Sequence, residues 1–511
     1  MGSLPEVVLP ARLQGPGAFK PLPSWSRMAK DTFFENVHKN LPGCWSGMQF
    51  PHTSQQLQDF GPEWFTDAFH RFGTLPADNK ITEVSGVYQL ASSGFDTAGG
   101  AALKASFKVK YAKPDPSLHT ELFAKFPHDA VESLMLRFNL SAMTDEATVE
   151  LNTNALCEHL FPFEIPKVYF CDISRESTNW VLITECIPFG KRGRITNGRP
   201  EVLEREPFAI LPICGKYMDY MLEDPASIYF AIFYALAALA GWDQQGRFDS
   251  FLGPKVTYTE KEFLATRGPK NPKPMKMGDA KSRGAINYLE HTIAFATEVA
   301  PQLFSPQVRS PNNIAKMRED FGHMARHFDD IRNFMDNTSD WVAAAHLNLQ
   351  SDNAYFWRDE TGDTDVGILD WAGFQRQAFV KPFMGCLRSA STDMLLAHED
   401  GLMQAFCSEY VRYGGPFIDW QSLLIRHRLM QITFVIETSQ FVNNTLLADM
   451  PASEWKSVKS QYDDAVMNRF TARCRSHCLI NCLEYWQLVD FRKVFDDWAA
   501  GAGKAYMTEF R

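Results

Sequence analysis

Residues that can hold a metal ion and phosphate groups cluster near position 350. Two short apolar runs, 354–357 and 366–369, flank an acidic turn, which predicts a β-hairpin. Such a hairpin brings Asn353, just before the first run, and Asp370, just after the second, to the same end. An oxygen pair of this kind can hold Mg²⁺, which in turn can hold phosphates. The alternative is a hairpin whose flanking residues are polar by coincidence.

Two charged residues and a glycine-rich turn lie far upstream of this hairpin. Lys125 interrupts the apolar run LFAKF and must reach the surface or meet an anion, because an isolated buried charge is unfavourable. Glu150 in the next predicted helix is a candidate partner. The turn SSGFDTAGG at 92–100 can point backbone N–H groups at a phosphate, although tight hairpins also collect glycine. Each signal therefore counts only together with the others.

A change of hydrophobic period divides the chain into a β-rich part and a helical part. From Thr82 the apolar residues alternate, which predicts strands, and after Gly190 the pattern is mostly helical. The strands are expected at 84–90, 102–111, 119–126, 166–172 and 180–185, and the helices that precede Gly190 at 62–72 and about 145–160.

These elements predict three regions. They are an extension with one helix at 1–80, a small β-rich lobe at 81–190, and a larger helical lobe at 191–511 that carries the hairpin at 346–370. The pattern is α+β, and the cleft between two lobes is a usual ligand site. The polar stretch 268–284 is expected to be a flexible loop.

Composition narrows the classes of partner. The net charge is −10, from 51 Lys and Arg against 61 Asp and Glu, which argues against generic nucleic-acid binding. The apolar stretch 226–242 is at the short limit for crossing a bilayer and lacks flanking positive charge, so we expect a buried core helix and no membrane span.

The cysteines predict an intracellular protein. Ten cysteines without a C-x-x-C pair are typical of reduced thiols, and we expect a cytoplasmic location. Cys474, Cys478 and Cys482 are spaced four residues apart and share one face of a helix. With His477 nearby, a metal site is one interpretation; close packing of a buried helix is the favoured one.

The ordered motifs resemble the aminoglycoside phosphotransferase and choline kinase superfamily. HLNLQSDNAYF at 346–356 is similar to the H-G-D-x-R-x-D-N-x-x-F motif of its ecdysteroid kinase-like (CHK kinase-like) branch, and ILDW at 368–371 to that branch's V-x-D-W. Upstream, TAGGAALKASFKVKY resembles the phosphate loop and second strand, LFAKFP the lysine strand, and ATVELNTNAL the E-x-x-F-Y helix. The resemblance covers roughly residues 60–400, and the ordered set is more specific than any single motif.

This resemblance implies a protein kinase-like two-lobe fold that uses ATP and Mg²⁺ to phosphorylate a hydroxyl of a small molecule. In it, the lysine meets the nucleotide phosphates and the helix glutamate, and the strand after the helix leads to the adenine. The residues implied are Gly94, Gly99, Gly100, Lys125, Glu150, Cys186 and Ile187 for the nucleotide, Asn353 and Asp370 for Mg²⁺, and His346, Asn348 and Asp352 for catalysis.

The chain departs from the family pattern at the catalytic base. Where the family has Gly-Asp, this sequence has Leu347 and Asn348, and a neutral amide holds a hydroxyl but takes no proton. Loss of a general base typically costs ~10²–10⁴-fold in rate. Asp352 is a candidate substitute, and Asp96 in the phosphate loop would repel phosphate. Two hypotheses therefore stand: a weakened small-molecule kinase, favoured here, and a pseudokinase-like nucleotide-binding or scaffold protein.

Overall fold

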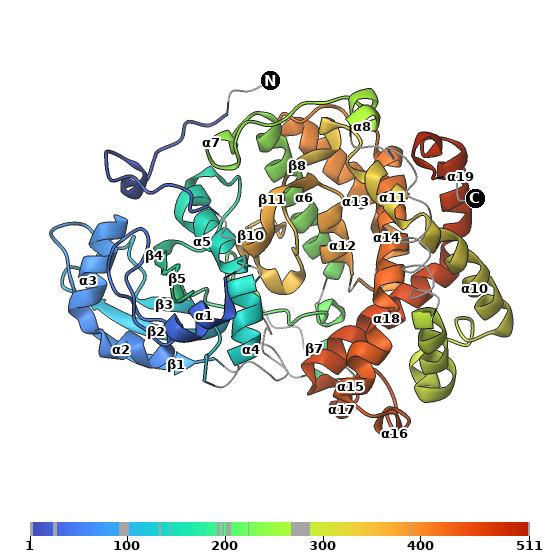
Figure 1. Cartoon of the computed structure of the whole chain (residues 1–511), viewed down its shortest axis with the longest axis horizontal. Helices are drawn as coiled ribbons and strands as arrows, with labels where there is room; N and C mark the ends of the chain where they lie inside the picture. Colours follow the sequence, from blue (N-terminus) through green and yellow to red (C-terminus); the bar gives the residue numbers. More distant parts are fainter. Residues whose placement is uncertain are drawn as a thin grey trace.

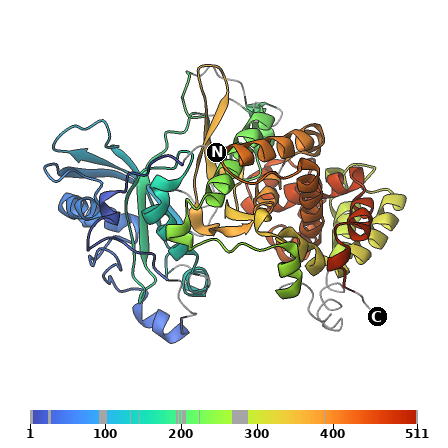
Figure 2. The same cartoon turned by 90° about the horizontal axis from the view of Figure 1, so that it is seen from above.

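The chain folds into two lobes that lie side by side (Figures 1 and 2). The computed structural model describes residues 4–23, 28–90, 102–131, 134–143, 145–191, 195–196, 199–200, 206–222, 224–266, 287–388 and 390–508. The phosphate-loop residues Gly94, Asp96, Gly99 and Gly100 and the loop expected at 268–284 lie outside these ranges, so their predicted roles stay predictions.

The N-terminal lobe is built on a five-stranded antiparallel sheet of order β1-β2-β3-β5-β4. The alternation in the sequence is the cause, since Ala105, Phe107 and Val109 of β2 are buried on one face. All five strands lie where the sequence predicts them. Their bounds are β1 Ile81–Gln89, β2 Leu103–Tyr111, β3 Glu121–Phe126, β4 Val168–Ile173 and β5 Trp180–Glu185.

Helices cover the sheet, and one of them also contacts the second lobe. Phe65 and Phe69 of α3 pack on Phe107 and Tyr169, with ring centroids 5.4 and 5.2 Å apart. Helix α5, in the predicted place, packs against β4 and the turn after β10. The helices of this lobe are α1 Lys30–Asn36, α2 Ser54–Asp59, α3 Gly61–Phe72, α4 Leu134–Arg137 and α5 Glu146–Cys157.

The C-terminal lobe is mainly helical, and the two-lobe α+β arrangement predicted from the sequence is confirmed. Its described helices are α6 Pro225–Gln244, α7 Asp249–Leu252, α8 Glu260–Thr266, α10 Pro311–Arg326, α11 Phe328–Met335, α12 Lys381–Leu387, α13 Thr392–Arg412, α14 Trp420–Thr438, α15 Leu447–Asp449, α16 Ala452–Trp455, α17 Asp464–Met467, α18 Phe470–Leu488 and α19 Phe491–Ala500.

Helix α6 is the apolar stretch that matches a membrane span in length. Asp224 caps it by accepting a hydrogen bond from the backbone N–H of Ser227 at 3.2 Å, and Pro225 begins its first turn. Its most apolar 18 residues have a mean hydropathy of 1.5, but 67% of them are buried inside the protein. It packs along α13 and against β8, as expected of a core helix.

Short strands hold the segment around position 350 between the lobes. The predicted hairpin is present as β9 Ala354–Arg358 paired with β10 Thr364–Ile368. A second antiparallel pair, β8 Val342–His346 with β11 Phe374–Ala378, was not predicted, because the run of alanines in β8 has no period of two. A small ribbon, β6 Ile195–Thr196 with β7 Arg199–Pro200, lies after the N-terminal lobe. The β8–β11 pair holds both ends of segment 347–373, here called the catalytic segment because it contains Asn348 and Asp352, two of the residues predicted to act in catalysis.

Candidate active site

Lys125 lies at the centre of the site. It stands on β3 between Lys104 of β2 and Leu182 of β5, so its backbone is held on both sides. Its side chain is 12% exposed, and its Nζ donates to Glu150 Oε1 at 2.5 Å and to Asp370 Oδ1 at 2.7 Å. The lysine strand, the glutamate helix and the hairpin carboxylate therefore meet at one point, which is the geometry expected from the sequence.

The two carboxylates keep the lysine charged. Burial opposes the charge on Lys125, but Asp370 and Glu150 outweigh it and raise the pKa of the ammonium above its ordinary value. Lys125, in turn, holds the pKa of Asp370 well below the ordinary value of an aspartate. Glu150 lies deeper, and burial raises its pKa although Lys125 acts against this. The site thus holds an ionised lysine beside an ionised aspartate.

The hairpin delivers Asp370 beside Asn353. Ile368 pairs with Ala354 in the hairpin, and the backbone N–H of Leu369 donates to the Asn353 carbonyl at 2.8 Å. Asp370 then takes a left-handed conformation, with φ 63°. Non-glycine residues adopt that conformation rarely, mostly where surrounding structure holds them. Its side chain is 41% exposed, so the carboxylate faces the space between the lobes.

His346 holds the catalytic segment and is not placed to react. Its Nε2 meets the Leu369 carbonyl at 2.9 Å, and its Nδ1 accepts from the backbone N–H of Asn348 at 3.2 Å, which together fit a neutral ring. Burial lowers its pKa further below the ordinary value. The ring packs on Trp371 at 5.0 Å, and Trp371 stacks on Phe161 at 4.2 Å. We interpret His346 as a positioning residue.

Asn348 is exposed at the cleft and is held from two sides. Gln350 Nε2 donates to its side-chain Oδ1 at 2.7 Å, and Asn353 Nδ2 donates to its backbone carbonyl at 2.7 Å. Because its amide oxygen accepts from Gln350, its amide nitrogen is the group left for a ligand. Asp352 is 7% exposed, its Oδ1 has no hydrogen-bond partner, and burial raises its pKa.

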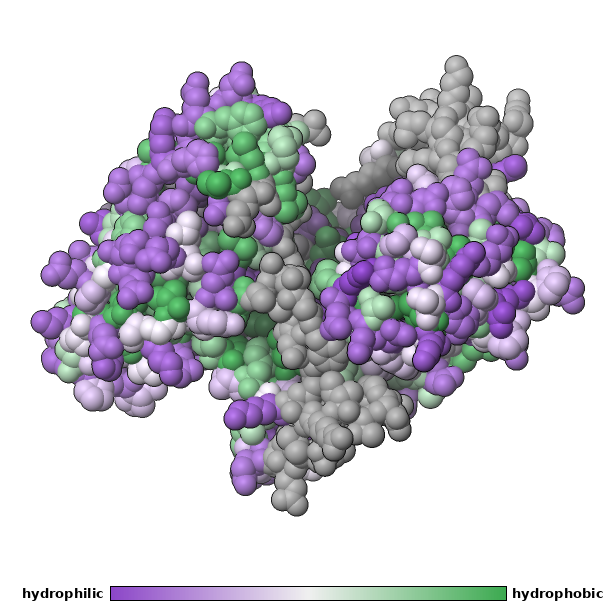
Figure 3. Space-filling view, turned by 90° about the horizontal axis from the view of Figure 1, so that it is seen from below, coloured by the Kyte–Doolittle hydropathy of each residue, from purple (hydrophilic) through white to green (hydrophobic). Residues whose placement is uncertain are grey.

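A cavity of about 940 Å³ between the lobes is lined by Lys125, Glu150, Asn348, Asp352, Asn353 and Asp370. Figure 3 shows the hollow between the lobes from below. The backbone of Cys186 and Ile187, predicted to meet adenine, follows β5 and lines the cavity. Sequence reasoning missed three further lysine or arginine residues that line it, Lys104, Arg137 and Lys216. The register that places Lys104 beside Lys125 could have been predicted from the strand pattern, whereas the irregular segment around Lys216 gives no such signal.

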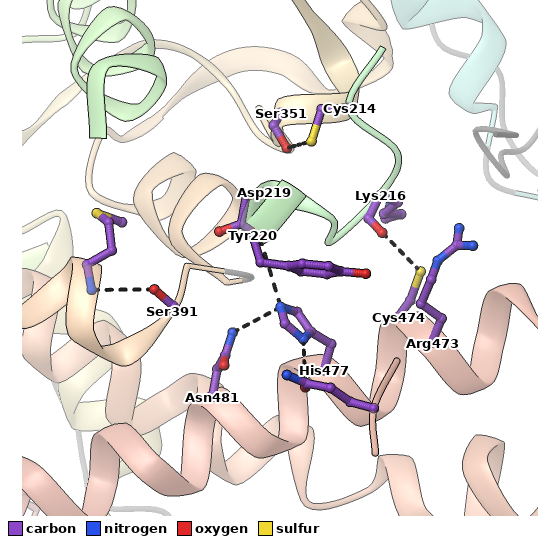
Figure 4. A network of polar contacts seen from close by, with 12 residues as sticks. Cys214, Lys216, Asp219, Tyr220, Ser351, Ser391, Arg473, Cys474, His477 and Asn481 are labelled. Atoms are coloured by element: carbon purple, nitrogen blue, oxygen red, sulfur yellow. Dashed lines mark hydrogen bonds and ion pairs between the residues drawn. The ribbon is translucent and has the colours of Figure 1, made fainter. Parts of the chain in front are cut away.

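Lys216 belongs to a segment that is fastened to both the catalytic loop and α18 (Figure 4). Ser351 Oγ donates to Cys214 Sγ at 3.4 Å, and Cys474 Sγ donates to the Lys216 carbonyl at 3.7 Å. Asp219 accepts from the Tyr229 hydroxyl at 2.9 Å and lies 3.9 Å from His477 Nε2. These contacts fix the backbone that carries Lys216 along the C-terminal wall of the cavity.

The cysteines of α18 are packed inside the protein. Cys474, Cys478 and Cys482 are buried, and burial raises the pKa of each thiol. Within the part of the chain that the structure describes, no group of three or more His, Cys, Asp or Glu side chains is arranged to hold a metal ion. The packing interpretation therefore stands.

Comparisons with known proteins give a structural similarity only. No protein-family model matches the sequence, and the search of curated proteins returned no match. Solved structures similar to this one include a macrolide 2'-phosphotransferase from Brachybacterium faecium, at 12% identity over 73% of this chain and 93% of that chain, with a TM-score of 0.35. An ethanolamine kinase from Plasmodium vivax matches at 11% identity over 80% and 83%, with a TM-score of 0.32. A spectinomycin phosphotransferase solved with ADP and spectinomycin matches at 11% over 77% and 94%, with a TM-score of 0.31. Such values assign neither family nor function to this chain.

Proposed function

We propose that this protein is a phosphotransferase that uses ATP and Mg²⁺ to phosphorylate a hydroxyl of a small molecule. The observation that carries the proposal is the contact of Lys125 with both Glu150 and Asp370 inside the cavity between the lobes. We further propose membership of the aminoglycoside phosphotransferase and choline kinase superfamily, near its CHK kinase-like branch. That assignment rests on the ordered motifs at 346–356 and 368–371 together with this geometry.

The nucleotide would lie against the N-terminal wall. The ammonium of Lys125 meets the α- and β-phosphates, and Glu150 holds that ammonium in place. Lys104, opposite Lys125 across the β2–β3 ladder, adds positive charge at the same wall. The backbone at Cys186 and Ile187 meets the adenine. Enzymes of phosphoryl transfer act mainly through positioning and charge stabilisation, and these groups supply both.

The donor atoms near Asp370 suit Mg²⁺. Asn353 uses its Nδ2 as a donor to Asn348, which leaves its Oδ1 for a ligand, and Asp370 offers a second carboxylate oxygen beside the one bound by Lys125. Oxygen ligands of this kind are those that Mg²⁺ prefers, and the bound ion would neutralise phosphate charge. Asn353 and Asp370 are therefore our proposed ligands.

Transfer would take place at the C-terminal wall. The acceptor oxygen forms a bond to the γ-phosphorus, the bond to the β-phosphate oxygen breaks, and ADP leaves. Asn348 orients the acceptor, and the acceptor's proton leaves to another base, for which Asp352 is the nearest candidate in the loop. Without a carboxylate at 348, we expect transfer to be slow.

A second candidate function is nucleotide binding without transfer. The observation that favours it is the amide at Asn348, which cannot accept the proton of a hydroxyl. Both candidate functions include nucleotide binding. The ten cysteines are all free, which suits a reducing compartment, and we propose that the protein is located in the cytoplasm.

Binding and turnover measured on the same preparation separate the candidates. Calorimetry with Mg²⁺-ATP reports binding, and ADP release with a panel of small alcohols reports transfer. Lys125→Met is the matched inactive variant. ADP release above that variant supports the kinase; binding with release at its level supports the second candidate; absence of binding by the wild type rejects both.

A further inference from the structure

A segment near the N-terminus lies along the helix that carries Glu150. Residues 10–23, here called the N-terminal strap, run beside α5 in Figure 1 and touch it at two places. At the first place, Arg12 Nε donates to the Ala155 carbonyl at 2.7 Å, and Arg12 Nη2 lies 2.6 Å from Glu158 Oε2. The strap thus grips the C-terminal end of α5.

The Arg12 side chain is buried and packs on an aromatic ring. The residue is 6% exposed, and its guanidinium lies 4.6 Å from the ring centroid of Phe72. The last carbonyls of a helix have no partner within the helix, and a cation there also meets the negative end of the helix dipole. Close packing fixes the strap on its other side, because a Cβ at Gly73 would lie 2.8 Å from Ala11 Cβ.

The second place is nearer the site. The backbone N–H of Leu22 donates to Asn152 Oδ1 at 2.8 Å, and Asn152 Nδ2 donates to the Leu22 carbonyl at 2.7 Å. Asn152 is 8% exposed, so this paired contact is shielded from water. The Asn152 side chain bonds only to backbone atoms of the strap. The contact therefore depends on where the strap lies and not on which residue stands at position 22.

The contact with Asn152 lies on the face of α5 that looks away from the site, and the contact with Arg12 lies at the C-terminal end of the helix. Glu150 is two residues from Asn152, so the two side chains point in nearly opposite directions. The strap therefore holds the back of the helix while Glu150 reaches Lys125 from the front. A shift of α5 by about 1 Å would open the 2.5 Å contact between them.

We propose that Arg12 and Asn152 are positioning residues for the nucleotide site, acting through α5 to keep Glu150 on Lys125. The inference rests on the proposed function, because it assigns Lys125 to the nucleotide phosphates. In two-lobe kinases the corresponding lysine–glutamate pair must be in place for transfer. Here the strap, far from the pair in sequence, supplies that placement, so displacing the strap would lower affinity for phosphates without touching the cavity.

The test compares ligands with and without phosphates. Arg12→Met removes both hydrogen bonds and keeps the length of the side chain; Arg71→Met is the matched control, because Arg71 is exposed, donates to the Ser46 carbonyl and has no contact with α5. In Arg12→Met we expect about tenfold weaker ATP binding, unchanged adenosine binding, and faster amide hydrogen exchange over 146–157. Arg71→Met should match the wild type in all three measurements.

Two results would overturn the strap's role. One is equal ATP affinity and equal exchange over 146–157 in Arg12→Met and Arg71→Met. The other is an equal loss for ATP and adenosine, which is the signature of general damage to the fold. Asn152→Leu gives the same expectations should Arg12→Met fail to fold. A wild type that binds neither ligand rejects the proposed function itself. If the wild type binds ATP, and Arg12→Met equals Arg71→Met in ATP affinity and in exchange over 146–157, only the strap's role is rejected.

Discussion

The two walls of the cavity, one formed by the N-terminal lobe and one by the C-terminal lobe, differ in which residues of the resembling family's motifs they keep. The N-terminal wall has a complete lysine–glutamate pair at 2.5 Å, joined by Asp370 from the hairpin. The C-terminal wall keeps the loop but has the amide of Asn348 where the resembling family has a carboxylate. Holding phosphates needs only fixed charges, whereas taking a proton needs a particular acceptor. Under the proposed function, one wall would therefore serve a nucleotide while the other would limit transfer.

The altered wall is nevertheless well ordered. Asn348 accepts from Gln350, receives Asn353 at its carbonyl and donates its backbone N–H to His346. These hydrogen bonds satisfy the polar groups of the loop and hold position 348 in one conformation. The difference between the walls is thus one of chemistry at a single side chain, and substitutions at the two walls should have separable effects.

The largest expected effect is at the junction of the walls. Asp370→Ala removes a partner of Lys125 and a proposed Mg²⁺ ligand, so Mg²⁺-ATP affinity should fall by about 100-fold, equivalent to ~3 kcal/mol. Calorimetry with and without EDTA measures it. Asp365→Ala, an exposed aspartate on the same hairpin, is the control and should bind like the wild type. Equal affinity in both variants would remove Asp370 from the site.

A smaller effect is expected from repairing the C-terminal wall. Asn348→Asp is nearly isosteric and restores a proton acceptor, so ADP release should rise about tenfold while ATP affinity changes little. Asn444→Asp, on the surface of the same lobe, controls for added charge. If the variant binds ATP and its turnover stays at background, the simple weakened-kinase account is rejected. High wild-type turnover without a gain would point to Asp352 as the base.

The order of the loop predicts a coupling between two of its residues. Gln350 is 2% exposed and donates to both Asn348 Oδ1 and, at 3.3 Å, the Tyr217 hydroxyl. In a Gln350→Leu background, the gain from Asn348→Asp should shrink to about threefold, because the new carboxylate is no longer oriented. A double-mutant cycle of ADP release measures this. Additive effects would show that Gln350 does not hold position 348.

The smallest expected effect on the cavity comes from Glu399, a buried residue on α13 of the C-terminal lobe. Burial opposes the charge of Glu399, but the adjacent His427, 3.3 Å away, and the hydrogen-bonded Arg428 outweigh it and lower the pKa of the carboxyl to about 2. Since this is below the ordinary value, the stability it contributes is complete above pH ~4.5 and is lost as the pH falls toward 2. Glu399→Gln should destabilise the fold by ~2 kcal/mol at neutral pH and leave ATP affinity unchanged.

Denaturant unfolding at several pH values checks this last prediction. The stabilities of the wild type and of Glu399→Gln should converge as the pH falls below ~4.5, because the wild type then loses the same charge. A constant difference down to pH 3 would contradict it. A fall in ATP affinity in Glu399→Gln would show that the contacts of Glu399 and the cavity are not independent.

The sequence by itself determined the five strands of the N-terminal sheet, helices α3 and α5, and the hairpin, but not the short helices α1, α2 and α4. Alternation in β2 and β3 and the polar ends of the run at 354–368 are local patterns, and local patterns fix local structure. Lys125, Glu150 and Asp370 could also be chosen from sequence, because each is a charge whose apolar neighbours leave it few alternatives. Lys104 was overlooked although its register beside Lys125 follows from the same patterns.

Only the tertiary structure decided the rest. The strap's contact with α5 joins residues 143 positions apart, and the segment that carries Lys216 has no periodicity and is held by α18. The neutral role of His346 and the fixed amide of Asn348 depend on which atoms of Leu369 and Gln350 come within hydrogen-bond distance. Such placements arise from long-range packing and single hydrogen bonds, for which a linear pattern carries no signal.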